Sequence, residues 1–389
     1  NIDAIAQEID TVYHNYNINK IYLDAYQQVS SSGGQRYPDA RQAIVDNVNV
    51  GALIMHYYGH GGEVGWAEER VLELNDINSW DNYNNLPVFV TATCEFSRYD
   101  DAQRASAGEQ VLLNPEGAGI ALFTTTRTIT EDDAKNLSRS FYKYALPESV
   151  GEVLTFGQLI RSMKNDLNST GISATNKLKF TLLGDPALKL PIPQLNVVVT
   201  EILNPNTNEQ IDTLNALSKV KVKGAVLSED GYVMNSFNGM LKSKVYDKPI
   251  KLQTLNNDFE DLEPFNFDLQ QSILYAGNVS VENGLFEFEF VVPQDISYVD
   301  GFGKFSFYAY NEQQDAIGAH VDIIIGGFDE DAEIDNIGPV IDLYMNNTDF
   351  RYGGITDANP SLYAVISDDS GINTTGNGIG HDLVATLDD

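Results

Sequence analysis

Two residues of the sequence have side chains suited to acyl-transfer chemistry. Cys94, the only cysteine among 389 residues, directly follows the apolar run VFVTAT (88–93), and His60 stands in the motif GHGG directly after GALIMHYY (51–58). A thiol attacks an acyl carbon as its thiolate, so it needs a neighbouring base or imidazolium. A histidine can fill that role and later protonate the leaving amine. The sequence therefore predicts nucleophilic catalysis, with Cys94 as nucleophile and His60 as its partner.

The glycines beside His60 extend this prediction to the backbone. Glycine has no Cβ, so its backbone can approach a substrate closely. The N–H groups of these glycines, with that of Cys94, are expected to form an oxyanion hole, in which one donor is typically worth about 3 kcal/mol of barrier lowering. Because many proteins contain a histidine and a cysteine without using them, a purely structural pair is the competing interpretation.

Helix-like and strand-like segments alternate from residue 1 to about residue 193 and must position these side chains. Pro38 suits the first turn of a helix, and Ser106 with Glu109 has the spacing of a capping box. The later elements expected are a strand over 117–126 and helices near 132–145, 155–168 and 173–181. Short apolar strands separated by helices indicate a doubly wound parallel sheet.

The two reactive residues share one position relative to this predicted sheet. In an open parallel sheet, ligands bind beyond the carboxyl ends of the strands. His60 and Cys94 each follow such an end, at the exits of two inferred strands. We therefore expect their side chains to project into one cleft if the two strands are neighbours.

The composition changes after the first domain, which we place at residues 1–193. Alternating and β-branched runs separated by Asn, Asp and Gly turns follow, and GLFEFEFVV (284–292) alternates as a half-buried strand should. This spacing predicts an immunoglobulin-like β-sandwich over residues 194–327. We interpret residues 328–389 as an acidic linker and the start of a further, truncated β-domain.

The bulk composition narrows the function classes. The net charge is −32, and so acidic a surface repels phosphate backbones, which argues against nucleic acid as a partner. A single cysteine cannot form an intrachain disulfide. The sequence contains no run of eighteen apolar residues, so it predicts no membrane-spanning helix. Both ends of the sequence fall within patterned segments, which predicts a fragment or processed product of a longer protein.

Five segments resemble gingipain-type cysteine peptidases of family C25, which have a caspase-like fold. They are HYYGHGGEVGWAEERVL (56–72), VFVTATCEFSRYDD (88–101), SAGEQVL (106–112), GAGIALFTTTR (117–127) and FTLLGDPALKLPIP (180–193). The resemblance covers residues 1 to about 193 and implies that the amino-terminal subdomain of the family is missing. Matched motif to motif, it implies His60 as the catalytic histidine, Cys94 as the nucleophile and Gly61 at the oxyanion position. The family's acidic orienting group would lie before residue 1, so none is assigned.

Within this family the chain is similar to the sortases of type IX secretion. That likeness rests on CEFSRYDD after the nucleophile and on the downstream segments 279–296, 337–347 and 371–382. It implies an enzyme at the bacterial cell surface, associated with the outer membrane, that removes the carboxy-terminal signal domain of secreted cargo through a thioester on Cys94. The acyl group would pass to a lipopolysaccharide amine or to water. The implied partners are cargo proteins, an outer-membrane β-barrel anchor of the secretion system, and lipopolysaccharide.

Two other functions stay open from the sequence. One is a gingipain-like secreted endopeptidase that hydrolyses a broad range of proteins. The other is a catalytically inactive surface scaffold, against which the intact settings of His60 and Cys94 argue. A sortase should ignore casein and act on cargo junctions, whereas a digestive peptidase should cleave many unfolded proteins.

Several further residues are candidates for a pocket or a metal site. Trp66 and Glu95 are expected to line a substrate pocket, with plain packing and a solvated loop charge as their respective alternatives. No cofactor is required by this chemistry. His56 lies four residues before His60, but on a strand and without an HExxH pattern, which argues against zinc. Calcium is an alternative to a solvated linker at one acidic cluster, which comprises Asp329, Glu330, Asp331 and Asp335.

Overall fold

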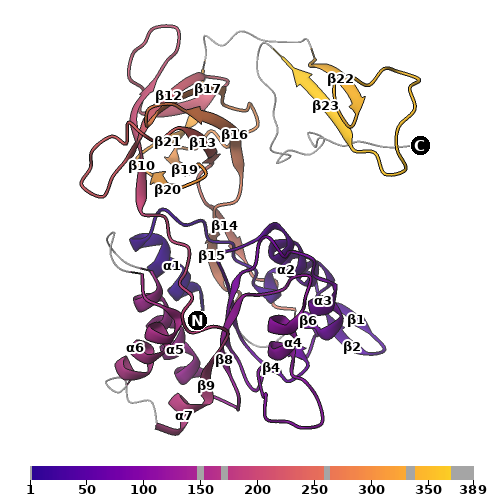
Figure 1. Cartoon of the computed structure of the whole chain (residues 1–389). Coiled ribbons are helices and arrows are strands. Elements are labelled where there is room, and N and C mark those ends of the chain that lie inside the picture. The colour runs from indigo at the N-terminus through magenta and orange to yellow at the C-terminus, as the bar shows by residue number, and fades with distance from the viewer. Residues whose placement is uncertain (1, 147–152, 168–173, 258–262, 330–337, 369–389) are drawn as a thin grey trace. The chain divides into compact units, whose positions relative to one another are not determined.

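A four-stranded sheet lies within the first of the two units into which the chain divides. The computed structural model describes all residues except 1, 147–152, 168–173, 258–262, 330–337 and 369–389. The first unit comprises residues 1–192 and 250–269, and the second comprises 193–249 and 270–389 (Figure 1). The strand hairpin 250–269 therefore belongs with the first unit, although it lies between strands of the second along the sequence.

The sheet has the strand order β3-β7-β8-β9. Strands β3 (Ile54–Tyr58), β7 (Val88–Ala92) and β8 (Ala121–Thr125) run parallel, whereas β9 (Phe180–Leu183) runs antiparallel to β8. The predicted mixed α/β architecture is confirmed. The expectation of a wholly parallel sheet is wrong, because β9 is antiparallel to β8. The helix predicted near 173–181 ends at Lys179, because the next residue enters β9 and buries its aromatic ring completely.

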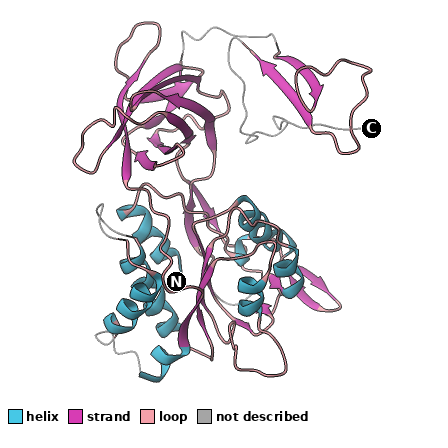
Figure 2. Cartoon of the chain, in the orientation of Figure 1, coloured by secondary structure: helices cyan, strands magenta, loops and turns pink. Residues whose placement is uncertain are grey.

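Helices cover both faces of this sheet, and the two-residue period of the strands explains how. On β7, Phe89 joins one core cluster with residues of α2, α3 and α4, whereas Val88 and Val90 join another with residues of α5 and α6. The central strands β7 and β8 are buried along their whole length, as expected for strands covered on both faces. Figure 2 shows the two groups of helices on either side of the strands.

The helix boundaries follow local sequence signals. Pro38 begins α2, and Ser106 and Glu109 cap α4 reciprocally, which confirms the predicted capping box. None of the described helices is long and apolar enough to cross a membrane. The helices of the first unit are α1 (Ile2–Val12), η1 (Leu23–Ala25), α2 (Pro38–Val50), α3 (Leu74–Ser79), α4 (Ala107–Leu113), α5 (Glu131–Ala145), α6 (Phe156–Asp166) and α7 (Ala174–Lys179).

Short strands complete the first unit. Strands β4, β5 and β6 form a small antiparallel sheet directly after β3, while β1 with β2 and β14 with β15 form two hairpins. The bounds are β1 (Val29–Ser31), β2 (Gly34–Arg36), β4 (Gly61–Gly62), β5 (Gly65–Trp66), β6 (Leu72–Glu73), β14 (Ile250–Gln253) and β15 (Asn266–Leu269).

The second unit is built from strands. A seven-stranded sheet has the order β16-β13-β19-β20-β10-β12-β17, and a three-stranded sheet has the order β11-β21-β18. Tyr275 on β16 stacks on Phe288 of β17 with ring centroids 5.1 Å apart, so the two edge strands of the large sheet meet across one shared core. The immunoglobulin-like sandwich stays a prediction for this unit. Its strands are β10 (Leu195–Leu203), β11 (Thr213–Ala216), β12 (Lys219–Leu227), β13 (Gly239–Tyr246), β16 (Ile273–Val281), β17 (Leu285–Val291), β18 (Gly301–Phe302), β19 (Lys304–Tyr310), β20 (Asp315–His320), β21 (Ile324–Phe328), β22 (Val340–Met345) and β23 (Leu362–Ser367).

Candidate active site

The strands that precede His60 and Cys94 are neighbours in the sheet. In the parallel register of β3 and β7, Tyr58 pairs with Ala92. His60 follows Tyr58 by two residues, and Cys94 follows Ala92 by two residues. Neighbouring strands lie about 4.8 Å apart, so both reactive residues leave the same edge of the sheet from adjacent strands.

The segment that carries the nucleophile is a tight turn in an unusual conformation. Glu95, the residue after Cys94, has φ 54°, in the left-handed region that non-glycine residues rarely occupy. Cys94 itself is half-buried, and its Sγ lies 3.8 Å from the carbonyl oxygen of Ile129. Backbone strain of this kind recurs at active sites, where packing around the residue holds it in place. The thiol thus sits at a sharply shaped strand exit and remains partly accessible.

His60 is fixed through its backbone and exposes its side chain. Its carbonyl oxygen accepts hydrogen bonds from the Tyr57 hydroxyl at 2.6 Å and from the Ala67 N–H at 2.8 Å. Among the described residues, no hydrogen bond joins the imidazole to Cys94. The ring can therefore still turn toward a substrate or toward the thiol.

Gly61 brings the histidine loop against the nucleophile turn. A Cβ at this position would lie 2.6 Å from Oγ1 of Thr93 and 3.1 Å from the carbonyl oxygen of Gly65. Neither neighbour can withdraw easily, because Thr93 is buried and the other contact is backbone. Only glycine fits here, and its N–H lies next to His60 in the chain, where the sequence predicted an oxyanion donor.

Glu63 connects the histidine loop to the nucleophile loop by charge. Its Oε1 lies 2.7 Å from Nη1 of Arg98, and its Oε2 lies 3.5 Å from Nε of Arg104. Its carbonyl oxygen also accepts the N–H of Ala107 at the start of α4. The glutamate side chain is 14% exposed, so the pair with Arg98 is less screened than an open surface ion pair.

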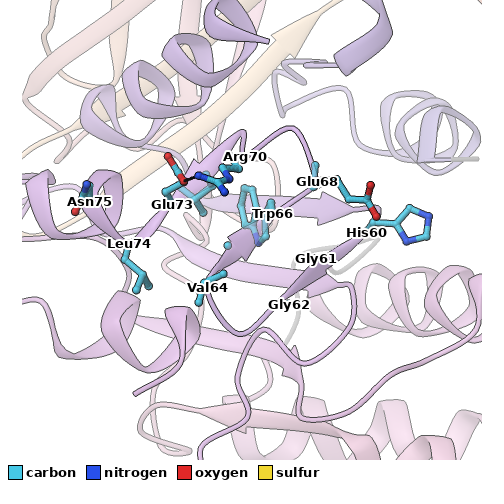
Figure 3. A pocket seen from close by; sticks show the side chains of 13 residues that line it. His60, Gly61, Gly62, Val64, Trp66, Glu68, Arg70, Glu73, Leu74 and Asn75 are labelled. Atoms are coloured by element: carbon cyan, nitrogen blue, oxygen red, sulfur yellow. Dashed lines mark ion pairs between the residues drawn. The ribbon is translucent and has the colours of Figure 1, made fainter. Parts of the chain in front are cut away.

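An open pocket of about 520 Å³ begins at His60 and extends over the small sheet β4-β5-β6. Figure 3 shows the imidazole at one end of the pocket and Leu74 with Asn75 at the other. Trp66 is among the lining residues, yet it is 1% exposed and stacks on Tyr57 with ring centroids 4.2 Å apart, so its main contacts are with the core. Its role in a substrate pocket stays a prediction.

The remaining lining combines glycines and apolar side chains with charged ones. Two lining residues form an ion pair, in which Nη1 of Arg70 lies 3.6 Å from Oε1 of Glu73. Nη1 of Arg41 lies 3.0 Å from the other oxygen of the same carboxylate. Cys94 and Glu95 are not among the lining residues, so the pocket adjoins the histidine side of the site.

The other predicted candidates lie apart from this chemistry. His56 on β3 hydrogen-bonds the hydroxyls of Ser138 and Tyr142, and its burial lowers its pKa to about 4. It is a neutral packing residue beneath α5. Searched over the described residues, the chain holds no cluster of metal-ligating side chains. The proposed calcium cluster falls largely on residues 330–337, outside the described residues, so that expectation stays a prediction.

The buried hydroxyls beneath the nucleophile were not predicted from the sequence. Thr91 donates to Thr124 at 2.6 Å, Ser97 and Thr124 share a hydrogen bond of 2.8 Å, and the Thr125 hydroxyl donates to the carbonyl of Thr93. A signal was present, since two otherwise apolar strands end in the runs TAT (91–93) and TTT (124–126). Polar residues in fully covered strands must find hydrogen-bond partners inside the protein.

Known proteins and structures share features with this chain. The family model of peptidase family C25 matches residues 1–191. The chain matches no curated protein. Among solved structures it is similar to dimeric latent PorU from Porphyromonas gingivalis, with 26% identity over 92% of this chain and 31% of that one, and a TM-score of 0.39.

Two gingipain structures are also similar to it. One is the complex of the pro- and mature domains of RgpB from Porphyromonas gingivalis, with 14% identity over 72% of this chain and 57% of that one (TM-score 0.36). The other is the arginine-specific cysteine proteinase gingipain R, with 15% identity over 72% of this chain and 56% of that one (TM-score 0.32). The chain therefore spans less than two thirds of the length of each of these three solved chains.

Proposed function

Because residues 1–191 belong to peptidase family C25, a family of cysteine peptidases, we propose that this chain carries a peptidase centre with Cys94 as nucleophile and His60 as acid–base partner. The observation that supports this most is the register of β3 and β7, which brings the two residues out of adjacent strands at equal offset. The contact of Gly61 with Thr93 supports it further, because it joins the two loops directly. We also propose that this domain has a caspase-like fold.

Each residue has a defined task in the proposed reaction. His60 accepts the thiol proton as Sγ of Cys94 attacks the carbonyl carbon of the scissile bond. The N–H groups of Gly61 and Cys94 receive the negative oxygen that forms. The C–N bond then breaks, and the imidazolium returns the proton to the leaving amine. An amine or water attacks the resulting thioester, His60 accepts the proton of this nucleophile, and the C–S bond breaks. The imidazolium then returns the proton to the departing thiolate, which restores the thiol of Cys94.

The substrate we propose is the junction between a secreted protein and its carboxy-terminal signal domain. The likeness of the sequence to type IX secretion sortases supports this choice. The acceptor would be a lipopolysaccharide amine or water, and the enzyme would act at the bacterial cell surface with an outer-membrane β-barrel as its anchor. The reaction needs no cofactor. Calcium at the acidic cluster and an immunoglobulin-like fold for residues 194–327 remain parts of this proposal.

The proposal predicts a strict requirement for the thiol. Replacing Cys94 with Ala should abolish cleavage of a folded reporter fused to such a signal domain, and His60→Ala should lower kcat/KM by about 10²- to 10⁴-fold. Intact-mass analysis of the reporter measures both effects. When an excess of a primary amine is added, part of the product should carry that amine on its new carboxyl terminus.

Two other results would argue against the proposed sortase activity. Efficient hydrolysis of casein with no preference for the junction would support the endopeptidase alternative over the sortase. Cleavage by Cys94→Ala at the rate of the unaltered chain would contradict the proposed function.

A further inference from the structure

Thr125, the last residue of β8, brackets the turn that carries the nucleophile. Its hydroxyl donates a hydrogen bond to the carbonyl of Thr93, and its own carbonyl accepts the N–H of Ser97 at 3.0 Å. These two contacts lie on opposite sides of Cys94 along the chain. Thr125 is fully buried, so it cannot touch a substrate. Any influence on the reaction must act through the turn itself.

The contact continues from Thr93 to the histidine loop. Thr93 is 1% exposed, and within the described part of the chain its Oγ1 has no hydrogen-bond partner. That oxygen lies against Gly61, where a Cβ would approach it to 2.6 Å. A shift of Thr93 would therefore displace both Cys94, the next residue, and Gly61, the neighbour of His60.

We propose that Thr125 is a positioning residue that sets the placement of Cys94 relative to the His60 loop through its hydroxyl. This inference rests on the proposed function, because it concerns the same nucleophile. The strained φ of Glu95 supports it, since a left-handed residue persists only where its surroundings over-determine the backbone. A buried hydroxyl with one fixed acceptor supplies such a constraint, because it cannot exchange that partner for water.

The chain offers a matched set of variants for the test. Thr125→Val keeps the branched shape and removes the hydroxyl, whereas Thr125→Ser keeps the hydroxyl. Thr91→Val is the control, because Thr91 is equally buried in the neighbouring strand but its hydroxyl bonds, among the described residues, to Thr124 and not to the backbone of the nucleophile turn. Since Cys94 is the only cysteine, alkylation by iodoacetamide at neutral pH, followed by intact-mass analysis, reports on this one thiol. Thermal unfolding of each variant measures its general loss of stability.

We expect Thr125→Val to slow alkylation of the folded chain by about fivefold, which corresponds to the loss of one buried hydrogen bond. Thr125→Ser and Thr91→Val should stay within about twofold of the unaltered chain, even where Thr91→Val lowers Tm as much as Thr125→Val does. In denaturant all four chains should react alike. Equal rates for Thr125→Val and the unaltered chain would overturn the proposal, as would an equal loss in the Thr91→Val control. If Thr125→Val does not fold, Thr125→Ala is measured in the same way.

The readout also separates this inference from the proposed function. Alkylation of Cys94 depends on the placement and surroundings of the thiol and needs no peptide substrate. Cleavage by Cys94→Ala would defeat the proposed function but leave the alkylation test intact. A normal alkylation rate in Thr125→Val, beside a Cys94→Ala variant that is inert toward substrate, would defeat only the positioning role.

Discussion

Two histidines on or beside the same strand differ completely in their surroundings. His56 lies within β3 and uses both ring nitrogens in hydrogen bonds to α5, while His60 follows the strand and exposes its ring. Burial disfavours the charged imidazolium of His56 and so lowers its pKa to about 4. The sequence already distinguishes the two, because His56 falls inside an apolar run whereas His60 stands among glycines. The catalytic role of His60 stays a prediction.

The buried histidine predicts a pH dependence of stability. Its folded-state pKa is about 4 and its ordinary value is 6.5, so the unfolded chain takes up a proton first as the pH falls. Stability from this group is complete above pH 6.5 and declines from there toward pH 4, at most by about 2 kcal/mol between pH 7 and pH 5. Urea unfolding at both pH values measures it. His56→Gln should lose less stability over that interval, and an identical loss in variant and unaltered chain would contradict this origin.

The contacts of Trp66 could not be predicted from its residue type. The sequence left a pocket role and a packing role open, and the structure shows the indole both lining the pocket and stacked on Tyr57. The stacking brings Tyr57 of β3 against Trp66 of β5, and no local pattern in the sequence specifies this contact. Residue type alone therefore does not specify the contacts of this side chain.

At the scale of elements, the first turn of α4 supports the nucleophile turn from outside. The N–H of Gly108 donates to the carbonyl of Phe96 at 2.8 Å. A Cβ on Gly108 would lie 1.8 Å from Oγ of Ser97 and 3.0 Å from the Phe96 carbonyl oxygen. The helix thus approaches the turn as closely as backbone atoms allow.

Gly108→Ala tests this close approach through opposing effects. Alanine favours a helix over glycine by about 1 kcal/mol, but forcing atoms into a packed site costs about 1–3 kcal/mol. With a contact of 1.8 Å, we expect the clash to dominate and the free energy of unfolding to fall. Chemical denaturation measures the change, and Gly108→Ala combined with Ser97→Ala should recover part of it. A more stable Gly108→Ala variant would show that α4 does not press on the turn.

The element pattern was predictable where local signals are strong. Short apolar runs gave β3, β7 and β8, and the capping box gave the start of α4. The fourth strand was missed, because Phe180 follows a helical stretch without a break and becomes a strand only by pairing with Thr125 of β8. Such pairing depends on residues 55 positions away, so helical periodicity was a poor guide there.

At the scale of the whole molecule, the hairpin β14-β15 packs against residues 22–26 of the first unit. The Asp24 carboxylate accepts the N–H of Asn256 at 2.9 Å and that of Asn257 at 2.8 Å, and its carbonyl accepts the N–H of Leu255. Phe267 packs edge-on against Tyr22 with ring centroids 4.8 Å apart. No local pattern predicts this docking, since it joins segments more than 230 residues apart.

Asp24→Ala should loosen this hairpin selectively. The carboxylate accepts three hydrogen bonds from the hairpin, two from backbone amides and one from the Asn257 side chain. Removing it should speed hydrogen exchange of the Asn256 and Asn257 amides by at least about tenfold, given the usual worth of hydrogen bonds to charged groups. Asp24→Asn, which keeps one acceptor oxygen, should fall in between. Unchanged exchange in Asp24→Ala would mean that other contacts hold the hairpin.

The proposed peptidase centre requires that Cys94 and His60 reach one another, and the cross-linking reagent 1,3-dibromoacetone tests this most directly. The thiol displaces one bromide, and a ring nitrogen within reach displaces the other, which leaves a short covalent bridge. We predict that peptide mapping of the folded chain finds Cys94 bridged to His60, and that His60→Ala gives no such bridge. Bridging of Cys94 to a different residue in the folded, unaltered chain, or attachment at the thiol alone, would contradict the proposed pair.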